Sequence, residues 1–365
     1  MPTRYTAESM PTQEPIRLDQ VSVTEMQQFD TCRRQWYLSS VKKLVPREPQ
    51  KALWFGIGIH EALEAYFGAR SGPLPRALTA LDNYYRKTTK EFARGYSPQM
   101  WGMVEDDFHQ TYLLGKEMLT GYHRFHHRIT APSPWKVIAV EQRVWVPIST
   151  PRGQQVLRGA PRLTARMDLM VQTGDGELGI IDHKTATQKP STGTVLDLDE
   201  QLTGYAYVYW KLTGEVVRFV TYDVLMKKAP EPPRELQSGE LSKDRAQPTT
   251  LELYLKAIKA RKESPNDPKY REILSALTAK GDSDYFMRVS TSRNEQQLRS
   301  YGQRLYHRFS QMRAVARDER LAYAQPSQMK CPSCSFLEVC LAKEAGYDAE
   351  SMIDQQFTAS TEERW

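Results

Sequence analysis

The sequence predicts an α+β fold in which a central mixed β-sheet is flanked by helices. Apolar residues recur at helical spacing before residue 131, alternate as in strands between about 135 and 226, and return to helical spacing after 250. The chain has 365 residues, of which 40% are hydrophobic and 26% charged. That composition supplies a large core and excludes disorder throughout, and the length suggests about two domains or one enlarged domain.

The first part of the chain is predicted to be an N-terminal helical region, residues 21–131, behind a polar, flexible leader, residues 1–20. Ser22 and Glu25 have the spacing of a capping box, which predicts a helix reaching about Tyr37. Further helical patterns cover residues 53–67, 75–95 and 103–129. The apolar stripe of the second helix consists of Trp54, Ile57, Leu63 and Phe67.

The middle of the chain, residues 132–227, is predicted to form the core sheet. Strand patterns cover residues 135–147, 163–172, 178–183 and 216–226, with a helix over 198–212. Residues 228–330 are expected to form an exposed loop (228–248), helices at 250–280 and 293–320, and a short strand at 285–289. The segment 331–365 begins with three cysteines and ends in a polar tail.

The charge balance and the cysteine content narrow the class of protein. Fifty Lys and Arg face 44 Asp and Glu, a net charge of +6, which is compatible with a polyanionic partner but does not establish one. No apolar run approaches the roughly 18 residues of a membrane span. We therefore expect no membrane association and a cytoplasmic location, or the host cytoplasm if the protein is phage-encoded. Four cysteines in so long a chain do not form a disulfide scaffold and fit a reducing compartment.

Two acidic residues on neighbouring predicted strands carry the most informative chemistry. The predicted strands that carry Asp168 and Asp182 are joined by a tight turn, so we expect the two carboxylates to lie within a few ångströms of each other. Two such carboxylates repel unless a divalent cation lies between them. Lys184 shares a strand face with Asp182, so its ammonium can hold or activate a water molecule that attacks a phosphate. The alternative is a solvated charge pair between Asp182 and Lys184.

Other polar residues stand at spacings that strengthen the first interpretation. His60 lies on a strongly apolar helix, and Gln201 and Tyr205 share one helix face. The chain contains the patterns G-x-x-x-H-x-x-x-E, R-x-D, D-x-K-T and Q-x-x-x-Y, at Gly56, His60, Glu64, Arg166, Asp168, Asp182, Lys184, Thr185, Gln201 and Tyr205. In these motifs and their order, the chain resembles the RecB-like branch of the PD-(D/E)XK nuclease superfamily from about Val21 to Cys340.

The resemblance implies a restriction-endonuclease-like core that hydrolyses DNA phosphodiesters with Mg²⁺ or Mn²⁺. It implies metal ligation by His60, Asp168, Asp182 and the backbone carbonyl of His183. Lys184 would orient the attacking water, while Gln201 and Tyr205 would position the strand or the groups around the metal ligands. Glu141 lies on the preceding strand, where the family often has a glutamate, and its role is left open.

The four cysteines form a second constellation. Cys331, Cys334 and Cys340 have C-x₂-C-x₅-C spacing, while Cys32 lies near the other end of the chain. Four thiolates suffice for one tetrahedral metal site or one cubane cluster. The layout resembles that of AddB-type nucleases and CRISPR-associated RecB-like exonucleases, which implies a [4Fe-4S] cluster forming a C-terminal staple. Zinc and free thiols remain alternatives.

The function expected from this resemblance is that of a DNA exonuclease acting on single strands or duplex ends, in recombination, repair or CRISPR-type DNA processing. Endonuclease activity, a helicase, recombinase or integrase partner, and a homo-oligomer are compatible with it. One alternative is a DNA-end-binding or assembly subunit that keeps the nuclease fold, although clustered carboxylates would not serve such a module. A zinc-stabilised, RNA-directed nuclease is a further alternative. The sequence has no Walker A motif, so we expect no ATPase of its own.

Overall fold

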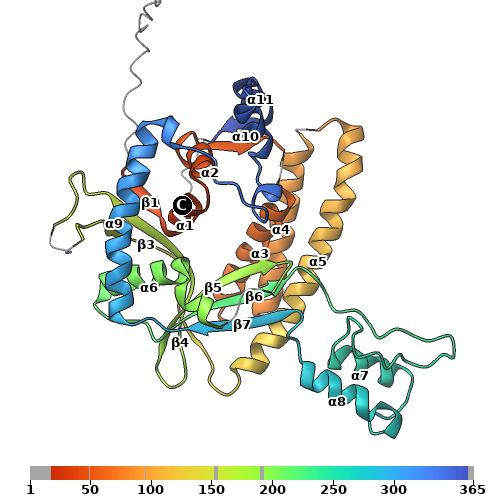
Figure 1. Cartoon of the computed structure of the whole chain (residues 1–365). Helices are drawn as coiled ribbons and strands as arrows, with labels where there is room; N and C mark the ends of the chain where they lie inside the picture. Colours follow the sequence, from red (N-terminus) through yellow and green to blue (C-terminus); the bar gives the residue numbers. More distant parts are fainter. Residues whose placement is uncertain (1–17, 49, 95, 152–154, 190–192, 361–365) are drawn as a thin grey trace, which may run out of the picture. The chain divides into compact units, whose positions relative to one another are not determined.

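The computed structural model describes residues 18–48, 50–94, 96–151, 155–189 and 193–360 (Figure 1). Most of the predicted leader, residues 1–17, lies outside this range. The chain divides into two compact units that interleave in sequence. Unit 1 comprises Met1–Glu48, Trp145–Thr164 and Arg299–Trp365, and unit 2 comprises Pro49–Val144 and Ala165–Leu298. The linear domain divisions expected from the sequence stay predictions.

Unit 2 is built on a mixed β-sheet, as the sequence predicts. Its strands are β3 (Lys136–Pro147), β4 (Arg162–Gln172), β5 (Leu178–Ala186), β6 (Phe219–Met226) and β7 (Phe286–Thr291), the end of β3 and the start of β4 belonging to unit 1. β3 pairs with β4, and β4 is antiparallel to β5. β5 and β6 run parallel, and β7 is antiparallel to β6 (Figure 1). The parallel pair requires a crossover, which α6 (Glu200–Thr213) supplies after η2 (Gly193–Leu198).

Three long helices pack against this sheet and confirm the predicted helical region. They are α3 (Lys51–Phe67), α4 (Pro73–Ala93) and α5 (Pro98–Thr130). Their buried side chains form one apolar cluster with strand residues such as Leu169, Ile181 and Leu225. The prediction for Ile57 was wrong, since its side chain is 43% exposed. α3 instead buries Phe55 and Ile59. Both belong to the apolar cluster that α3 shares with α4 and α5, so this side of the helix faces inward.

The segment after β6 forms a small helical module within unit 2. The predicted loop at 228–248 contains no helix, and α7 (Leu251–Ala260), η3 (Pro268–Tyr270) and α8 (Arg271–Lys280) follow it. The helical pattern at 250–280 is interrupted because Lys262 adopts a positive φ of 60°, which ends α7. Residues from both helices and the loop share a separate core, including Leu241, Tyr254 and Ile273.

Unit 1 brings the two ends of the described chain together. Its N-terminal elements are β1 (Gln20–Ser22), α1 (Val23–Thr31), α2 (Arg33–Trp36), η1 (Tyr37–Val41) and β2 (Leu44–Pro46). Its C-terminal elements are α9 (Glu295–Arg317, which begins in unit 2), η4 (Glu319–Leu321), η5 (Cys331–Ser333), α10 (Leu337–Glu344), α11 (Ala349–Gln356) and β8 (Phe357–Ala359). β1 lies parallel to the start of β4, and β2 pairs antiparallel with β8. The β2–β8 pair joins segments from opposite ends of the described chain, while the β1–β4 pair joins the start of that chain to its middle.

The predicted capping box is confirmed, but the first helix is shorter than expected. The Ser22 hydroxyl accepts a hydrogen bond from the Glu25 N–H at 3.1 Å, and the Glu25 carboxylate accepts one from the Ser22 N–H at 2.8 Å. The helix ends at Cys32, whose backbone is extended, and a new helix begins at Arg33.

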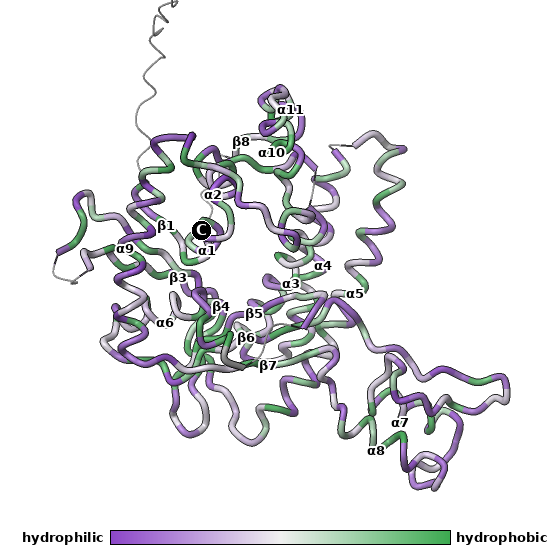
Figure 2. The backbone as a smooth tube through the Cα atoms, in the orientation of Figure 1, coloured by the Kyte–Doolittle hydropathy of each residue, from purple (hydrophilic) through white to green (hydrophobic). Residues whose placement is uncertain are grey.

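Figure 2 contrasts β6, which is mostly hydrophobic, with α9, which alternates between hydrophobic and hydrophilic residues. None of the described helices combines the length and the apolar character that a membrane span requires.

The packing of β5 against β6 generates a stability prediction. Gly179 lies opposite Phe219, and an added Cβ would overlap the Phe219 ring. We expect Gly179→Ala to lower the free energy of unfolding by about 1–3 kcal/mol, as overpacking does elsewhere. Thermal unfolding followed by circular dichroism measures this. The matched control is Gly102→Ala on exposed helix surface, where nothing lies within 4 Å of the added Cβ and stability should rise slightly. Equal melting temperatures for the two variants would contradict the packing described.

Candidate active site

Asp168 and Asp182 lie next to each other on β4 and β5. The antiparallel register pairs Leu169 with Ile181, so the two aspartates are the next residues along the ladder. Both are buried, with 8% and 2% of their surface exposed. Asp168 Oδ2 accepts a hydrogen bond of 2.8 Å from the backbone N–H of His183. Burial, followed by the negative charge of Asp182, raises the pKa of Asp168 to about 7.

His60 and Glu141 face the Asp168 carboxylate from two other elements. One ligating atom of each of the three residues lies within 4.8 Å of the other two. His60 comes from α3, and its Nδ1 is 3.5 Å from Asp168 Oδ2. Burial, followed by the neighbouring His183, lowers the pKa of His60 to about 4, so the imidazole is neutral at neutral pH. Neutral imidazole and carboxylate oxygens are groups that bind divalent metals.

Glu141 is the member of this set to which sequence reasoning assigned no role. It lies on β3 with a positive φ of 49°, uncommon for a residue with a side chain. A local distortion of this kind turns a strand side chain away from strict alternation, so the strand pattern could not show where Glu141 points. Arg166 of β4 forms an ion pair with its carboxylate. The signal available in the sequence was the position of a glutamate on the strand before Asp168.

Asp182 lies outside the close set formed by His60, Glu141 and Asp168, because other groups hold its carboxylate. Lys184 Nζ is 2.6 Å from Asp182 Oδ2, and Gln201 Nε2 donates to Asp182 Oδ1 at 3.1 Å. Lys184 also donates to Gln201 Oε1 at 3.1 Å. Burial alone would lower the pKa of Lys184, but Asp182 more than offsets it, so the pKa is raised and the amine stays protonated.

Gln201 and Tyr205 lie on the first turns of α6, on the face predicted for them. Asp199 caps this helix by accepting a hydrogen bond of 2.8 Å from the Leu202 N–H. Gln201 Nε2 contacts the Tyr205 hydroxyl at 2.9 Å. Tyr222 of β6 adds its hydroxyl, 2.9 Å from Asp199 Oδ1. The start of α6 therefore presents a hydrogen-bonded amide to Asp182 and Lys184.

The side chain of His183 projects from the opposite face of β5 to Asp182 and Lys184, with its ring 6.5 Å from that of His60. Its ring stacks on Phe67 at a centroid distance of 5.3 Å, and its Nδ1 is 3.4 Å from Asp223 Oδ2. Asp223 in turn accepts hydrogen bonds of 2.8 and 3.2 Å from Arg288 and one from Tyr122. Burial alone would raise the pKa of Asp223, but the Arg288 guanidinium more than offsets it and holds that pKa well below its usual range. His183 is therefore fixed from its side chain while its backbone N–H serves Asp168.

The four cysteines lie in unit 1, away from these residues in sequence. All four are partly buried and none forms a disulfide. Burial raises the pKa values of the Cys334 and Cys340 thiols, and the charges of Cys32 and Cys331 raise them further. Among the residues that the structure describes, no set of three ligating atoms within 4.8 Å includes a cysteine sulfur. The cysteines are thus not gathered into a closed staple, and the expected iron–sulfur cluster is not confirmed.

On this mixed sheet, the adjacent buried aspartates, the lysine beside the second and the facing histidine and glutamate form an acidic site that could hold a divalent metal ion. The model of the PD-(D/E)XK nuclease superfamily matches residues 20–341, and the chain belongs to this superfamily. None of the curated proteins compared with the chain matches it.

The raised pKa of Asp168 generates a prediction for metal binding. At a pH below its pKa of about 7, the Asp168 carboxyl holds a proton that a divalent ion must displace. We expect the affinity for Mn²⁺ to be about 10-fold weaker at pH 6 than at pH 8. Isothermal titration calorimetry in two buffers of different ionisation enthalpy measures both the affinity and the protons released. Asp168→Asn, which removes the titrating group, should weaken binding and flatten this pH profile, whereas a flat profile in the unmodified protein would contradict the assignment.

Proposed function

We propose that the protein is a Mg²⁺- or Mn²⁺-dependent nuclease that hydrolyses DNA phosphodiesters. The observation that carries the proposal is the position of Asp168, buried beside Asp182 and within 4.8 Å of both His60 and Glu141. Membership of the PD-(D/E)XK nuclease superfamily supports the same reaction class.

The residues present fit a hard divalent ion. His60, Glu141 and Asp168 offer one nitrogen and carboxylate oxygens in a close set. Asp182 and the backbone carbonyl of His183, expected as ligands from the sequence, are part of the proposal. A bound ion would lower the pKa of its water and offset the charge on the phosphate under attack.

The chain's own groups supply positioning and charge. Lys184 stays protonated between Asp182 and Gln201, so its ammonium can orient a water molecule and face a phosphate oxygen. Gln201 donates to Asp182 and accepts from Lys184, which fixes the angle between the carboxylate and the amine. Tyr205 holds the same amide from one helical turn further along α6. These contacts hold the polar groups in place before a substrate arrives, which lowers the cost of reorganisation.

The four patterns around His60, Asp168, Lys184 and Gln201 favour the RecB-like branch of the superfamily. That branch favours an exonuclease acting on single strands or duplex ends, which we include in the proposal.

The proposal also includes a [4Fe-4S] cluster held by Cys32, Cys331, Cys334 and Cys340. Its support is that all four cysteines belong to one compact unit, none forms a disulfide, and their thiols interact electrostatically. A cubane binds each thiolate through a different iron, so its ligands stand further apart than those of a single zinc ion. Such a cluster would link the two ends of the chain within unit 1.

Substitution of the lysine tests the nuclease proposal. Lys184→Ala removes the ammonium next to Asp182, so we expect Mn²⁺-dependent cleavage of an end-labelled single strand to fall by about 10²-fold or more. Lys256→Ala, an exposed lysine of α7, is the matched control and should cleave at the original rate. Cleavage by Lys184→Ala at the rate of the unmodified protein would contradict the proposal. Cleavage of RNA without cleavage of DNA would contradict the proposed DNA substrate.

Metal analysis tests the cluster. Protein purified without oxygen should contain about four irons and four sulfides per chain and absorb near 400 nm, as a [4Fe-4S] centre requires. The Cys331→Ser variant should lose most of this iron. The control is the Lys184→Ala variant, which has all four cysteines and should keep its iron. One zinc per chain and no sulfide would instead identify a zinc site.

A further inference from the structure

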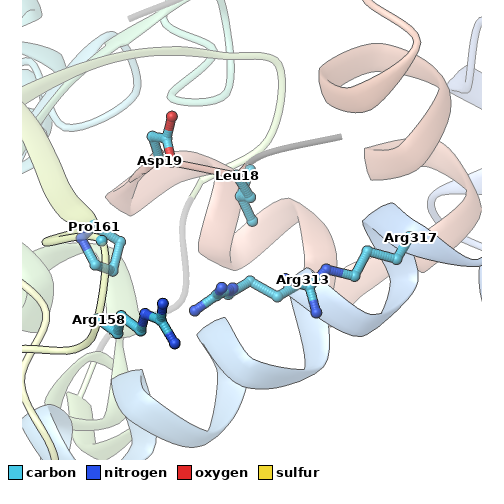
Figure 3. A pocket seen from close by; sticks show the side chains of 7 residues that line it. Leu18, Asp19, Arg158, Pro161, Arg313 and Arg317 are labelled. Atoms are coloured by element: carbon cyan, nitrogen blue, oxygen red, sulfur yellow. The ribbon is translucent and has the colours of Figure 1, made fainter. Parts of the chain in front are cut away.

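A pocket in unit 1 lies outside the proposed active site and has an unusual charge. Its volume is about 520 Å³, and it is lined by Leu18, Asp19, Arg158, Gly159, Pro161, Arg313 and Arg317. Arg158 comes from the loop before β4, while Arg313 and Arg317 come from α9. The guanidinium groups of Arg158 and Arg313 point toward one another, and Arg317 follows along the helix (Figure 3).

The positive charge of this pocket is not balanced within the part of the chain that the structure describes. None of the three arginines forms an ion pair with a described residue, whereas Arg308, earlier on α9, is paired with Asp30 at 2.9 Å. Asp19 is the one acidic residue among the described lining residues, and it stands apart from the guanidinium groups (Figure 3). Like charges that converge in a concavity repel, so the arrangement favours an anionic ligand.

The arrangement of the arginines fits phosphate groups. A guanidinium presents a planar fork of donors that matches two phosphate oxygens. Arg313 and Arg317 are one helical turn apart, about 6 Å along the axis, so each can bind a separate phosphate along a strand. The pocket therefore suits a chain of phosphates better than one isolated anion.

An aromatic residue linked to the pocket wall through Arg162 indicates what carries these phosphates. Arg162 directly follows the lining residue Pro161, and its backbone N–H donates to the Asp19 carbonyl at 3.0 Å. The Arg162 guanidinium stacks on Trp145 at 4.2 Å, yet 48% of the Trp145 surface remains exposed. Exposed aromatic rings next to basic grooves stack the bases of single-stranded nucleic acids.

We propose that this pocket binds the phosphate backbone of a single nucleic-acid strand through Arg158, Arg313 and Arg317, with Trp145 stacking on a base. The proposal rests on the proposed function, because it names the substrate class as a single strand. It adds a contact in unit 1 that lies outside the residues that would carry out hydrolysis.

The test is the affinity for a fluorescent 20-residue oligothymidylate, measured by anisotropy in EDTA so that no cleavage occurs. For Arg158→Ala/Arg317→Ala we expect about 10-fold weaker binding at low salt, and a slope of log affinity against log salt that is smaller by about 1.4. Trp145→Ala should weaken binding about 5-fold or more with an unchanged salt slope. The control, Arg218→Ala/Arg245→Ala, removes two exposed arginines of unit 2 and should bind like the unmodified protein.

Binding by the arginine double variant equal to that of the control would overturn the proposal. Arg317→Glu, a single change at an exposed position, gives an independent comparison and should weaken binding further than Arg317→Ala. Competition with inorganic pyrophosphate separates a small phosphate ligand from a strand. If the arginine variants lose pyrophosphate binding but keep their affinity for the oligonucleotide, the proposal is overturned. Cleavage is measured separately with Mn²⁺, so arginine-dependent binding without any cleavage would refute the proposed nuclease while supporting this pocket.

Discussion

The burial of Asp168 beside Asp182 is the constraint to which the rest of unit 2 responds. Two carboxylates on adjacent strands repel, and burial increases the cost of each charge. Different groups stabilise the two carboxylates. The His183 N–H donates a hydrogen bond to Asp168, while Lys184 and Gln201 contact the carboxylate of Asp182. A sheet built for stability alone would place apolar side chains here, as it does at the preceding ladder positions. The acidic pair is therefore best explained by the chemistry it makes available.

The same sheet explains how the polar groups are kept in place. The parallel pairing of β5 with β6 requires a crossover, and the crossover helix delivers Gln201 and Tyr205 to the end of β5. α3 brings His60 from the opposite direction, held by its apolar packing on α4 and α5. On the far side of His183, the ion pair of Asp223 with Arg288 joins β6 to β7. Each polar residue thus stands on an element fixed by buried contacts rather than on a free loop.

Much of this arrangement could be predicted from sequence because its signals are local. The hydrophobic period identified the long helices, the capping box at Ser22 fixed a helix start, and strand alternation located β4 and β5. The features that escaped prediction depend on tertiary structure. The backbone at Glu141 is turned by a distortion that leaves no mark on alternation, and the first helix ends at Cys32 without Gly or Pro. The pairing of β2 with β8 joins opposite ends of the chain, which no local pattern reveals.

The central claim is that a divalent ion binds where His60, Glu141 and Asp168 meet. Anomalous diffraction from crystals equilibrated with Mn²⁺ tests it directly, because the signal of manganese locates the ion without reference to activity. We expect a peak at about 2.0–2.3 Å from the His60 imidazole and from a carboxylate oxygen of Asp168. A saturated crystal with manganese bound elsewhere, and none in contact with Asp168, would contradict the claim.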